Sequence, residues 1–363
     1  MIQILLLRRK DEFTFNRGLG RISKESRQKS MGIRLLMQNN SSLFPDQHTN
    51  LDFPGFYAIV GPTASGKTAL SLALAEYFKT DILCVDAMQV YQGLDIGTAK
   101  PTPEETSRVS HFGLDLIPPT RHFSASQYAE YGESIIQHYV SQKKPLVLCG
   151  GTGLYYRALL EGFFAAPDPE PDLRHRLKQQ TEERGAETMH QILHDRDPQT
   201  AETIHPNDVR RVLRALEIIE QTGKTVTQFR AEQKKKPWIK FTYFVGIERN
   251  KKDLSQRIEK RAKWMYNNGL INETQSLIDM HCNDSHTALQ ALGYKECYDY
   301  LTHRCTLAEA IEKTILGTRR YAKRQMTWFR RQFPTHWIYW EPGGNFQKIV
   351  DTSLHVFMNG GNN

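Results

Sequence analysis

The most informative stretch of the sequence is Gly61-Pro62-Thr63-Ala64-Ser65-Gly66-Lys67-Thr68, a match to the pattern G-x-x-x-x-G-K-[ST]. An apolar run at residues 56–60 precedes it, and an alanine- and leucine-rich run at residues 69–75 follows it. In a strand–turn–helix context this pattern forms a phosphate-binding loop, because inward-facing backbone amides and the helix N-terminus attract an anion. We therefore expect Lys67 to reach a terminal phosphate and Thr68 to offer its hydroxyl to Mg²⁺. The alternative is a chance match, and the pattern alone does not identify what carries the phosphates.

The composition bounds the class of protein. The chain has 363 residues, of which 39% are hydrophobic and 24% charged, which suits a soluble globular protein of two domains or of one domain with an insertion. No run of about 18 uncharged apolar residues occurs, so we expect no membrane segment. The five cysteines form no C-x-x-C pair, which favours a reducing cytoplasmic location and no zinc site. Residues 1–50 account for +5 of the net charge of +8, so the global charge says little about nucleic-acid binding.

The chain divides by composition and hydrophobic pattern into four parts. Residues 1–52 are expected to form a basic, poorly ordered extension, either a targeting segment or the product of a translation start placed too far upstream. Residues 53–165 and 239–341 carry the signals of a P-loop NTPase-like α/β core, a parallel sheet with flanking helices. Residues 166–238 show only helix signals and predict an inserted all-helical domain. Residues 342–363 are expected to form a loose tail.

Within the core, Asp86 ends a second buried strand at residues 81–86. Since ligands of open α/β sheets lie beyond the carboxyl ends of the strands, we expect this carboxylate to face the bound phosphates. It could hold Mg²⁺ through water, act as a general base, or merely cap a turn. The glycine-punctuated segment that follows, residues 87–101, is typical of a substrate-binding loop.

Two further strands are expected in the first half of the core, at residues 111–117 and 145–149. Between them, Ser124 or Ser126 is placed to cap a helix that runs to residue 143. The second strand leads into Gly150-Gly151-Thr152, another turn suited to an anion.

The rest of the chain is largely helical and basic. Helices are expected at residues 174–184, 187–194, 209–221 and 253–267, and strands at 241–247 and 337–340. A capping box at Thr306 opens a basic amphipathic helix that reaches residue 333. That helix could bind a phosphate backbone or point arginines at the phosphates.

Two short segments in this part are candidates for binding. Arg210, Arg211 and Arg214 share a helix start, and a solvated face is the alternative to a binding role. Residues 290–295 predict a turn into a helix with Tyr294 and Lys295 exposed.

Six motifs, in their order along the chain, closely resemble those of the tRNA dimethylallyltransferases, also called tRNA isopentenyltransferases or IPP transferases. They are residues 61–68, 85–91, 94–101, 150–155, 205–208 and 293–294. The resemblance covers residues 55–341 and is to the bacterial type, because the paired cysteines of a C-terminal zinc finger are missing. The N-terminal extension departs from the usual compact form.

The resemblance implies transfer of a dimethylallyl group from dimethylallyl diphosphate to N6 of the adenosine 3′-adjacent to a tRNA anticodon, which forms N6-isopentenyladenosine and releases diphosphate. By resemblance, residues 61–68 bind the diphosphate together with Arg257 and Arg261, and Thr68 binds Mg²⁺. The resemblance does not decide which of the two arginines contacts the diphosphate. It also implies Asp86 as the general base and Lys67 and Thr152 as further catalytic residues.

The resemblance also implies the tRNA anticodon stem-loop as partner, with its target base extruded into the enzyme. The implied tRNA-binding residues are Asp86, Ala87, Met88, Gln89, Asn207, Asp208, Val209, Arg210, Arg211, Gln290, Ala291, Leu292, Gly293, Tyr294 and Lys295. A cytoplasmic monomer without membrane contact is expected.

Two other functions compete with this interpretation. A P-loop small-molecule or nucleoside kinase would bind ATP, but no arginine-rich lid stands in the expected place. An RNA-binding protein with a degenerate phosphate loop would not need Lys67, Thr68 and Asp86 intact. The reaction product separates the three hypotheses: prenylated tRNA, a phosphorylated metabolite, or neither.

Overall fold

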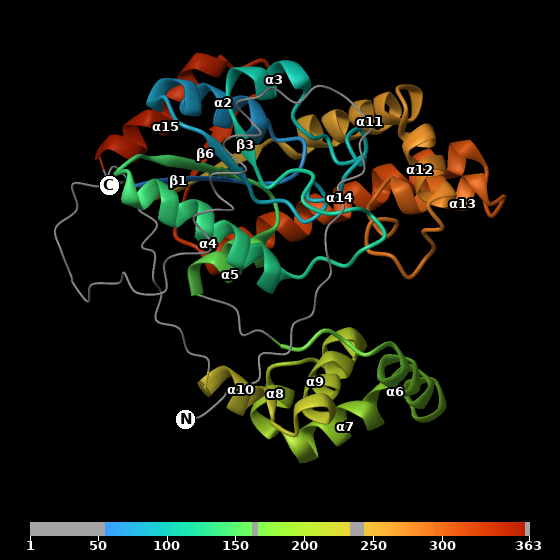
Figure 1. Ribbon diagram of the computed structural model, residues 1–363. Coiled ribbons are helices and arrows are strands. Elements are labelled where there is room, and N and C mark those ends of the chain that lie inside the picture. The colour runs from blue at the N-terminus through green and yellow to red at the C-terminus, as the bar shows by residue number, and fades with distance from the viewer. Residues whose placement is uncertain (1–54, 162–165, 233–242, 360–363) are drawn as a thin grey trace, which may run out of the picture. The chain divides into compact units, whose positions relative to one another are not determined.

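The computed structural model describes residues 55–161, 166–232 and 243–359. They form a parallel sheet flanked by helices, together with a group of helices that has a hydrophobic core of its own (Figure 1). The expectations for residues 1–52, and the first two residues of the strand expected at 241–247, lie outside the described residues.

Six strands make one sheet in which every neighbouring pair is parallel. Their order is β3-β2-β4-β1-β5-β6, with β1 at Phe56–Val60, β2 at Ile82–Cys84, β3 at His111–Phe112, β4 at Leu146–Cys149, β5 at Tyr243–Arg249 and β6 at Thr335–Trp340. The chain leaves β1 toward one side of the sheet and later returns to the other side at β5, so the strand order reverses beside β1. Ligands of such sheets bind beyond the carboxyl ends of the strands at this point. The predicted α/β fold is confirmed, and the glycine-rich loop lies where a ligand is expected.

The third strand is shorter than the predicted residues 111–117. Only His111–Phe112 pairs with β2. The chain then turns away at residues 113–115, where two residues have a positive φ. Ile117 donates its amide to the carbonyl of Val90 at 3.1 Å, so the end of the expected strand pairs with the loop at residues 87–101 instead of with the sheet.

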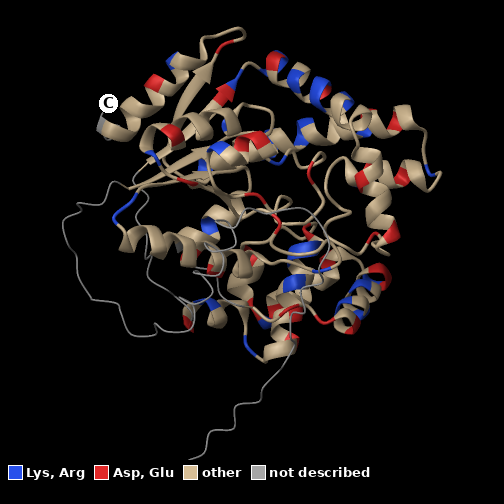
Figure 2. Ribbon diagram, turned by 45° about the horizontal axis from the view of Figure 1, so that its top comes forward, with Lys and Arg blue, Asp and Glu red and all other residues tan. Residues whose placement is uncertain are grey.

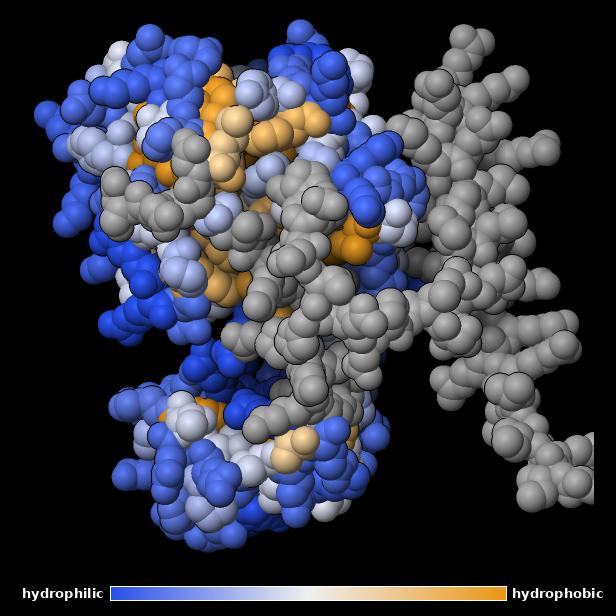
Figure 3. Space-filling model, turned by 90° about the vertical axis from the view of Figure 1, so that its left-hand side faces the viewer, coloured by the Kyte–Doolittle hydropathy of each residue, from blue (hydrophilic) through white to orange (hydrophobic). Residues whose placement is uncertain are grey.

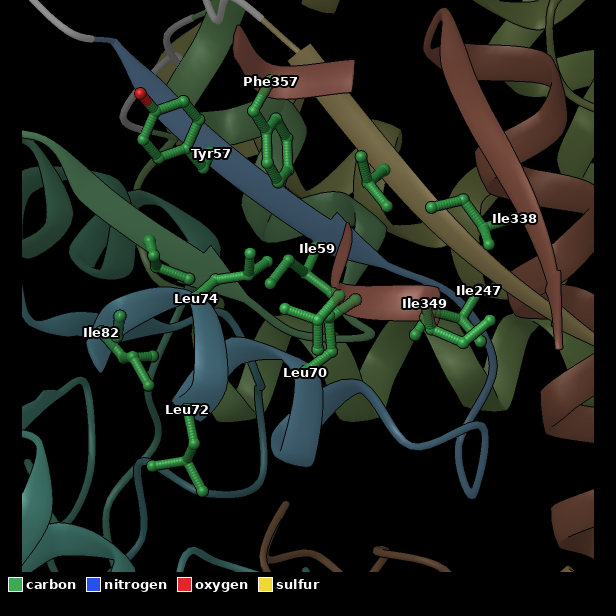
Figure 4. Packing of buried hydrophobic residues seen from close by; sticks show 14 of the residues in the cluster. Tyr57, Ile59, Leu70, Leu72, Leu74, Ile82, Ile247, Ile338, Ile349 and Phe357 are labelled. Carbon is green, nitrogen blue, oxygen red and sulfur yellow. The ribbon is translucent and has the colours of Figure 1, made fainter. Parts of the chain in front are cut away.

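Helices cover both faces of the sheet (Figure 1). On one face lie α2 (Lys67–Phe78) and α15 (Phe346–Asn359), and on the other lie α4 (Ala125–Ser141), α5 (Gly153–Glu161) and α14 (Leu307–Gln332). Alternate strand residues such as Tyr57 and Ile59 join the side chains of α2 and α15 in the core shown in Figure 4. The opposite face is filled by contacting aromatic rings, those of Tyr156, Phe244, Phe329 and Phe333.

The C-terminal segment is not the loose tail that was predicted for residues 342–363. It contains α15, which packs against α2, β5 and β6. The buried side chains of α15 are Ile349, Val350, Ser353, Val356 and Phe357. Their spacing is that of one helix face, and burial of this face holds the segment on the sheet.

The remaining described helices outside the insertion are α3 (Pro103–Arg108), α11 (Lys251–Asn267), α12 (Leu270–Asp279) and α13 (Tyr294–Leu301). Neither α3 nor α12 was predicted from the sequence. The capping signals were accurate, because Ser124 caps α4 and Thr306 caps α14, each with a reciprocal bond from the third residue of its helix. Such caps satisfy amide groups that have no partner within the helix.

The segment between the two halves of the core contains five helices and, among residues 166–232, no strand. They are α6 (Pro171–Arg184), α7 (Ala186–Arg196), α8 (Pro198–Glu202), α9 (Val209–Thr222) and α10 (Val226–Glu232), of which α8 and α10 were not anticipated. Their own core includes Leu177, Leu193, Val212 and Leu216. Glu217 is fully buried among them and accepts hydrogen bonds from Arg174 at 2.7 Å and from Arg214 at 3.1 Å.

None of the described helices is long and apolar enough to cross a lipid bilayer. The face of the molecule in Figure 3 is mostly hydrophilic, with hydrophobic residues in short patches between polar ones. All five cysteines are free thiols in the structure.

Candidate active site

A cavity of about 510 Å³ opens beside the glycine-rich loop, where β1, β2 and β4 end. Its lining comes mainly from three regions that lie far apart in the sequence: the loop itself at residues 63–68, β2 and β4 with the segments that follow them, and one face of α11. The cavity is large enough for a small phosphorylated ligand.

The glycine-rich loop has the backbone of an anion site. Ala64 and Gly66 have φ values of 65° and 102°, and α2 begins directly afterwards at Lys67. Ser65 is fully buried, and its hydroxyl has no hydrogen-bond partner among the described residues. The Lys67 ammonium donates to the carbonyl of Pro62 at 2.8 Å, and burial lowers the pKa of Lys67 to about 8. An unpaired buried hydroxyl and a desolvated ammonium both gain from a bound anion.

Two arginines of α11 reach the same loop. Arg257 donates to the carbonyl of Ala64 at 2.9 Å, and Arg261 donates to the hydroxyl of Thr63. Both line the cavity, so the structure brings together the two arginines between which the resemblance could not choose. Burial lowers the pKa of Arg261 to about 10, while the Asp86 carboxylate acts in the opposite direction.

Asp86 lies just beyond the end of β2 and lines the cavity. Its Oδ1 accepts a hydrogen bond from the amide of Met88 at 2.9 Å, so the carboxylate does close a turn, as one of the alternatives proposed. Burial raises its pKa, and the Met88 amide, Lys67 and Arg261 oppose that rise. A carboxylate with a raised pKa in a cavity that also holds cations is a candidate for proton transfer.

Thr152 lies behind the wall of the cavity, whereas Gly150 and Gly151 line it. Its hydroxyl accepts a hydrogen bond from the amide of Ala87 at 3.0 Å. Its role as a catalytic residue stays a prediction. The hydroxyl supports the turn that carries Asp86.

The segment at residues 290–295 corrects one expectation. Tyr294 was predicted to be exposed, but it is fully buried. Its hydroxyl donates to Glu273 of α12 at 2.6 Å and accepts from the amide of Gly97 at 3.2 Å. Glu273 also accepts from the amide of Ile96 at 2.8 Å. Tyr294 therefore holds the loop at residues 87–101, and in this segment only Gln290 and Lys295 are exposed.

The other predicted RNA-binding segment, residues 207–211, starts α9. Asp208 caps this helix by accepting from the amide of Arg211 at 3.3 Å. Asn207, Arg210 and Arg211 are exposed. Arg214, in contrast, is bound to Glu217 and to the carbonyl of Pro167, so it serves the core of the insertion.

The family model described as IPP transferase matches residues 89–332 of the chain. A tRNA dimethylallyltransferase from Halothermothrix orenii is 40% identical over 316 residues, which cover 87% of this chain and 94% of the relative. The chain belongs to the IPP transferase family. A second relative, tRNA dimethylallyltransferase 2 of Geotalea uraniireducens, is 40% identical over 82% of this chain and 96% of its own length.

Solved structures agree with this membership of the IPP transferase family. The tRNA isopentenylpyrophosphate transferase from Bacillus halodurans has a TM-score of 0.62 and 37% identity, over 85% of this chain and 96% of that one. A eukaryotic dimethylallyltransferase described as acting on tRNA has a TM-score of 0.68 and 25% identity, over 84% of this chain and 79% of that one. As a member of this family the protein is a transferase.

The oxygen atoms around the cavity suit a magnesium ion that would be bound partly by the protein and partly by a diphosphate. No group of three or more His, Cys, Asp or Glu that could hold a metal occurs in the part of the chain that the structure describes. Magnesium bound chiefly by substrate phosphates needs only one or two protein oxygens. Thr68 and Asp86 both line the cavity and offer a hydroxyl and a carboxylate, so the residues fit such an ion.

Three supporting residues of this IPP transferase site were missed in the sequence. Gln325 of α14 accepts from the amide of Thr63 at 2.8 Å and donates to the carbonyl of Gly151 at 2.9 Å, so it joins the two glycine turns. Arg249 donates to the carbonyl of Ser65 at 2.7 Å, and its guanidinium lies 3.9 Å from the centre of the Trp340 ring. Glu273 is the third. A polar residue within the apolar stripe of α14 was the signal that could have identified Gln325.

These contacts show what the basic helix α14 contributes to the cavity. The alternatives were that it binds a phosphate backbone or that it points arginines at the phosphates. The side chain that reaches the loop is Gln325, and the cations that do so come from α11. Arg319 and Arg330 of α14 pair with carboxylates, and Arg320, Lys323 and Arg324 are exposed. Figure 2 shows that Lys and Arg residues occur on several helices of the molecule.

Gln325→Met is expected to lower kcat/KM for the diphosphate substrate by about 10- to 100-fold, because a small displacement of the loop misplaces its amides. The amide of Thr63 and the carbonyl of Gly151 would lose their partner, and the free energy of unfolding should fall by about 1–3 kcal/mol. Steady-state kinetics and denaturant unfolding measure the two effects. Gln332→Met, at an exposed position of the same helix, is the matched control, and equal kinetics of the two variants would contradict the prediction.

Proposed function

We propose that the protein transfers a dimethylallyl group from dimethylallyl diphosphate to N6 of the adenosine 3′-adjacent to the anticodon of tRNA. The observation that carries the proposal is that one cavity holds both a cationic phosphate loop and a carboxylate with a raised pKa. The names of the relatives support the choice of substrates, since they are tRNA dimethylallyltransferases.

The diphosphate occupies the glycine-rich loop in this proposal. The loop amides, Lys67, Arg257 and Arg261 surround its oxygens, and the Ser65 hydroxyl gains the partner that it lacks. These fixed charges stabilise the negative charge that grows on diphosphate as it leaves. A magnesium ion held by the hydroxyl of Thr68 would neutralise part of the same charge.

The adenine amine is the nucleophile. Its N6 nitrogen forms a bond to the allylic carbon while the bond from that carbon to the diphosphate oxygen breaks. Asp86 accepts the proton that N6 loses, and the electron pair of the broken bond leaves with diphosphate. The amide of Met88 orients the carboxylate, and Thr152 supports the turn through the amide of Ala87. An adenine amine is a weak nucleophile, so a positioned base and a stabilised leaving group both contribute.

The anticodon loop must present an unstacked base to this cavity, as enzymes that modify bases require. We propose that residues 86–89 contact the extruded adenosine and that the exposed Asn207, Arg210 and Arg211 of the insertion contact the stem-loop. Gln290 and Lys295 are the exposed candidates from the third segment. We further propose that the protein acts as a monomer in the cytoplasm, which suits its five free thiols.

Incubation with Mg²⁺, labelled dimethylallyl diphosphate and unmodified tRNA tests the proposal. We expect label in the RNA, in N6-isopentenyladenosine after nuclease digestion. A parallel incubation with ATP and candidate metabolites tests the kinase alternative. No labelled RNA with any tRNA, combined with turnover of ATP, would overturn the proposal in favour of a kinase. Tight RNA binding without either product would favour an RNA-binding protein.

A further inference from the structure

Trp264 of α11 stands at the mouth of the cavity. Its side chain is 54% exposed, although tryptophan is a residue that proteins usually cover. The other described tryptophans all have a ring or cation partner: Trp328 contacts Phe329, Trp337 contacts Arg330, and Trp340 contacts Arg249. Among the described residues no aromatic or cationic side chain covers the Trp264 ring, yet the residue lines the cavity.

Trp264 continues the face of α11 that binds the phosphate loop. Arg257, Lys260, Arg261 and Trp264 have the spacing i, i+3, i+4 and i+7, which is one face of a helix, and all four line the cavity. Arg257 and Arg261 contact the loop directly. Trp264 is seven positions after Arg257, so its Cα lies about 10 Å further along the helix axis.

The far end of α11 approaches the other wall of the cavity. A Cβ atom added at Gly269, just after α11, would lie 2.6 Å from Ile96 of the loop at residues 87–101. Thr98 and Ala99 of that loop line the cavity, and the Gln89 amide donates to both of their carbonyls at 3.2 Å. Trp264 therefore lies nearer than Arg257 and Arg261 to the end of α11 that approaches the loop at residues 87–101.

We propose that Trp264 is a stacking platform for a nucleobase of the acceptor RNA that flanks the reacting adenosine. The inference rests on the proposed function and adds a residue that the family motifs in the sequence do not include. The allyl group is short and remains joined to the diphosphate until transfer, so it stays close to Arg257 and Arg261. A flat, exposed ring two helical turns away suits the unstacked bases of a single-stranded loop, which proteins read by stacking on aromatic side chains.

Lys260 adds a cation on the same face. It is exposed, and the structure gives it no ion-pair partner within the described residues. It lies one turn before Trp264 and is placed to hold the backbone phosphate of the stacked nucleotide. Stacking of a nucleobase on Trp264 and attraction of its phosphate to Lys260 would together fix the position of one nucleotide, whichever base it carries.

Binding of a fluorescein-labelled anticodon stem-loop, measured by anisotropy, tests the proposal without requiring turnover. Trp264→Ala is expected to raise the Kd by about 5- to 150-fold, the range of one lost base–aromatic stack, and Trp264→Phe by less than about 3-fold. The KM for dimethylallyl diphosphate should remain that of the wild type. Tyr339→Ala removes another exposed aromatic ring, outside this cavity, and is the matched control.

Abasic RNAs identify the stacked nucleotide. When the base beside the target adenosine is removed, wild type and Trp264→Ala should bind with equal affinity. An unchanged Kd for Trp264→Ala, or a difference that persists with every abasic RNA, would overturn the proposal, as would an altered KM for dimethylallyl diphosphate alone. Failure of the proposed function is a separate outcome, since it would appear as RNA binding without transfer of label.

Discussion

Asp86→Asn is expected to lower kcat by about 10²- to 10⁴-fold, the contribution of a positioned general base. Asparagine has the same shape and can still accept the hydrogen bond of the Met88 amide, so the turn should remain intact. The KM for dimethylallyl diphosphate should change only a few-fold, because the loop and the α11 arginines are untouched. Steady-state transfer of label to tRNA measures both quantities.

The pH profile of the same pair of proteins tests the role of Asp86 more directly. Burial raises the pKa of this carboxyl above its ordinary range. A base works only when deprotonated, so wild-type activity should fall as the pH drops through that raised pKa, at a higher pH than an ordinary aspartate would give. Asp86→Asn should lack this acid limb. Asp81→Asn, just before the strand that Asp86 follows and outside the cavity, is the control. An acid limb that survives in Asp86→Asn would reject Asp86 as the base.

The parts of the site that could be predicted are those encoded in local sequence. The loop at residues 61–68 and Asp86 each belong to a short strand-and-turn pattern, and such patterns specify backbone geometry with little help from the rest of the chain. Gln325 could not be found in this way, because it meets Thr63 across 262 residues of sequence. Arg249 reaches Ser65 across 184 residues. Contacts of this kind depend on how helices pack on the sheet, and this packing cannot be predicted from the spacing of apolar residues in the sequence.

The errors have equally specific causes. Tyr294 follows Gly293 at a turn into a helix and was expected to be exposed, but α12 was not recognised, and the Tyr294 hydroxyl donates to Glu273 of that helix. The segment 342–363 begins with Pro342 and two glycines and ends with asparagines and glycines, and these hid the apolar face of α15. In both cases a helix was absent from the prediction, so the packing contacts that this helix makes were absent as well.

Lys67→Met is expected to lower kcat by about 10²- to 10³-fold, the loss found when one preorganised charge or donor is removed from a developing anion. The wild-type pH profile should also show the titration of this lysine. Its pKa is lowered to about 8 by burial, so the free enzyme loses the charge as the pH rises through about 8. We expect kcat/KM for dimethylallyl diphosphate to fall above that pH.

The profile of kcat should differ from that of kcat/KM, because the two report different states of the enzyme. A bound diphosphate stabilises the ammonium and raises the pKa of Lys67, so the basic limb of kcat should move to higher pH. Lys67→Arg is the matched control. It keeps the charge at all these pH values, and its kcat/KM should stay level above pH 8 at a reduced rate. If Lys67→Arg instead retains the limb near pH 8, the titrating group is not Lys67. Arg261, with a pKa lowered to about 10, would give a limb at a clearly higher pH, so the position of the limb distinguishes the two cations of the loop.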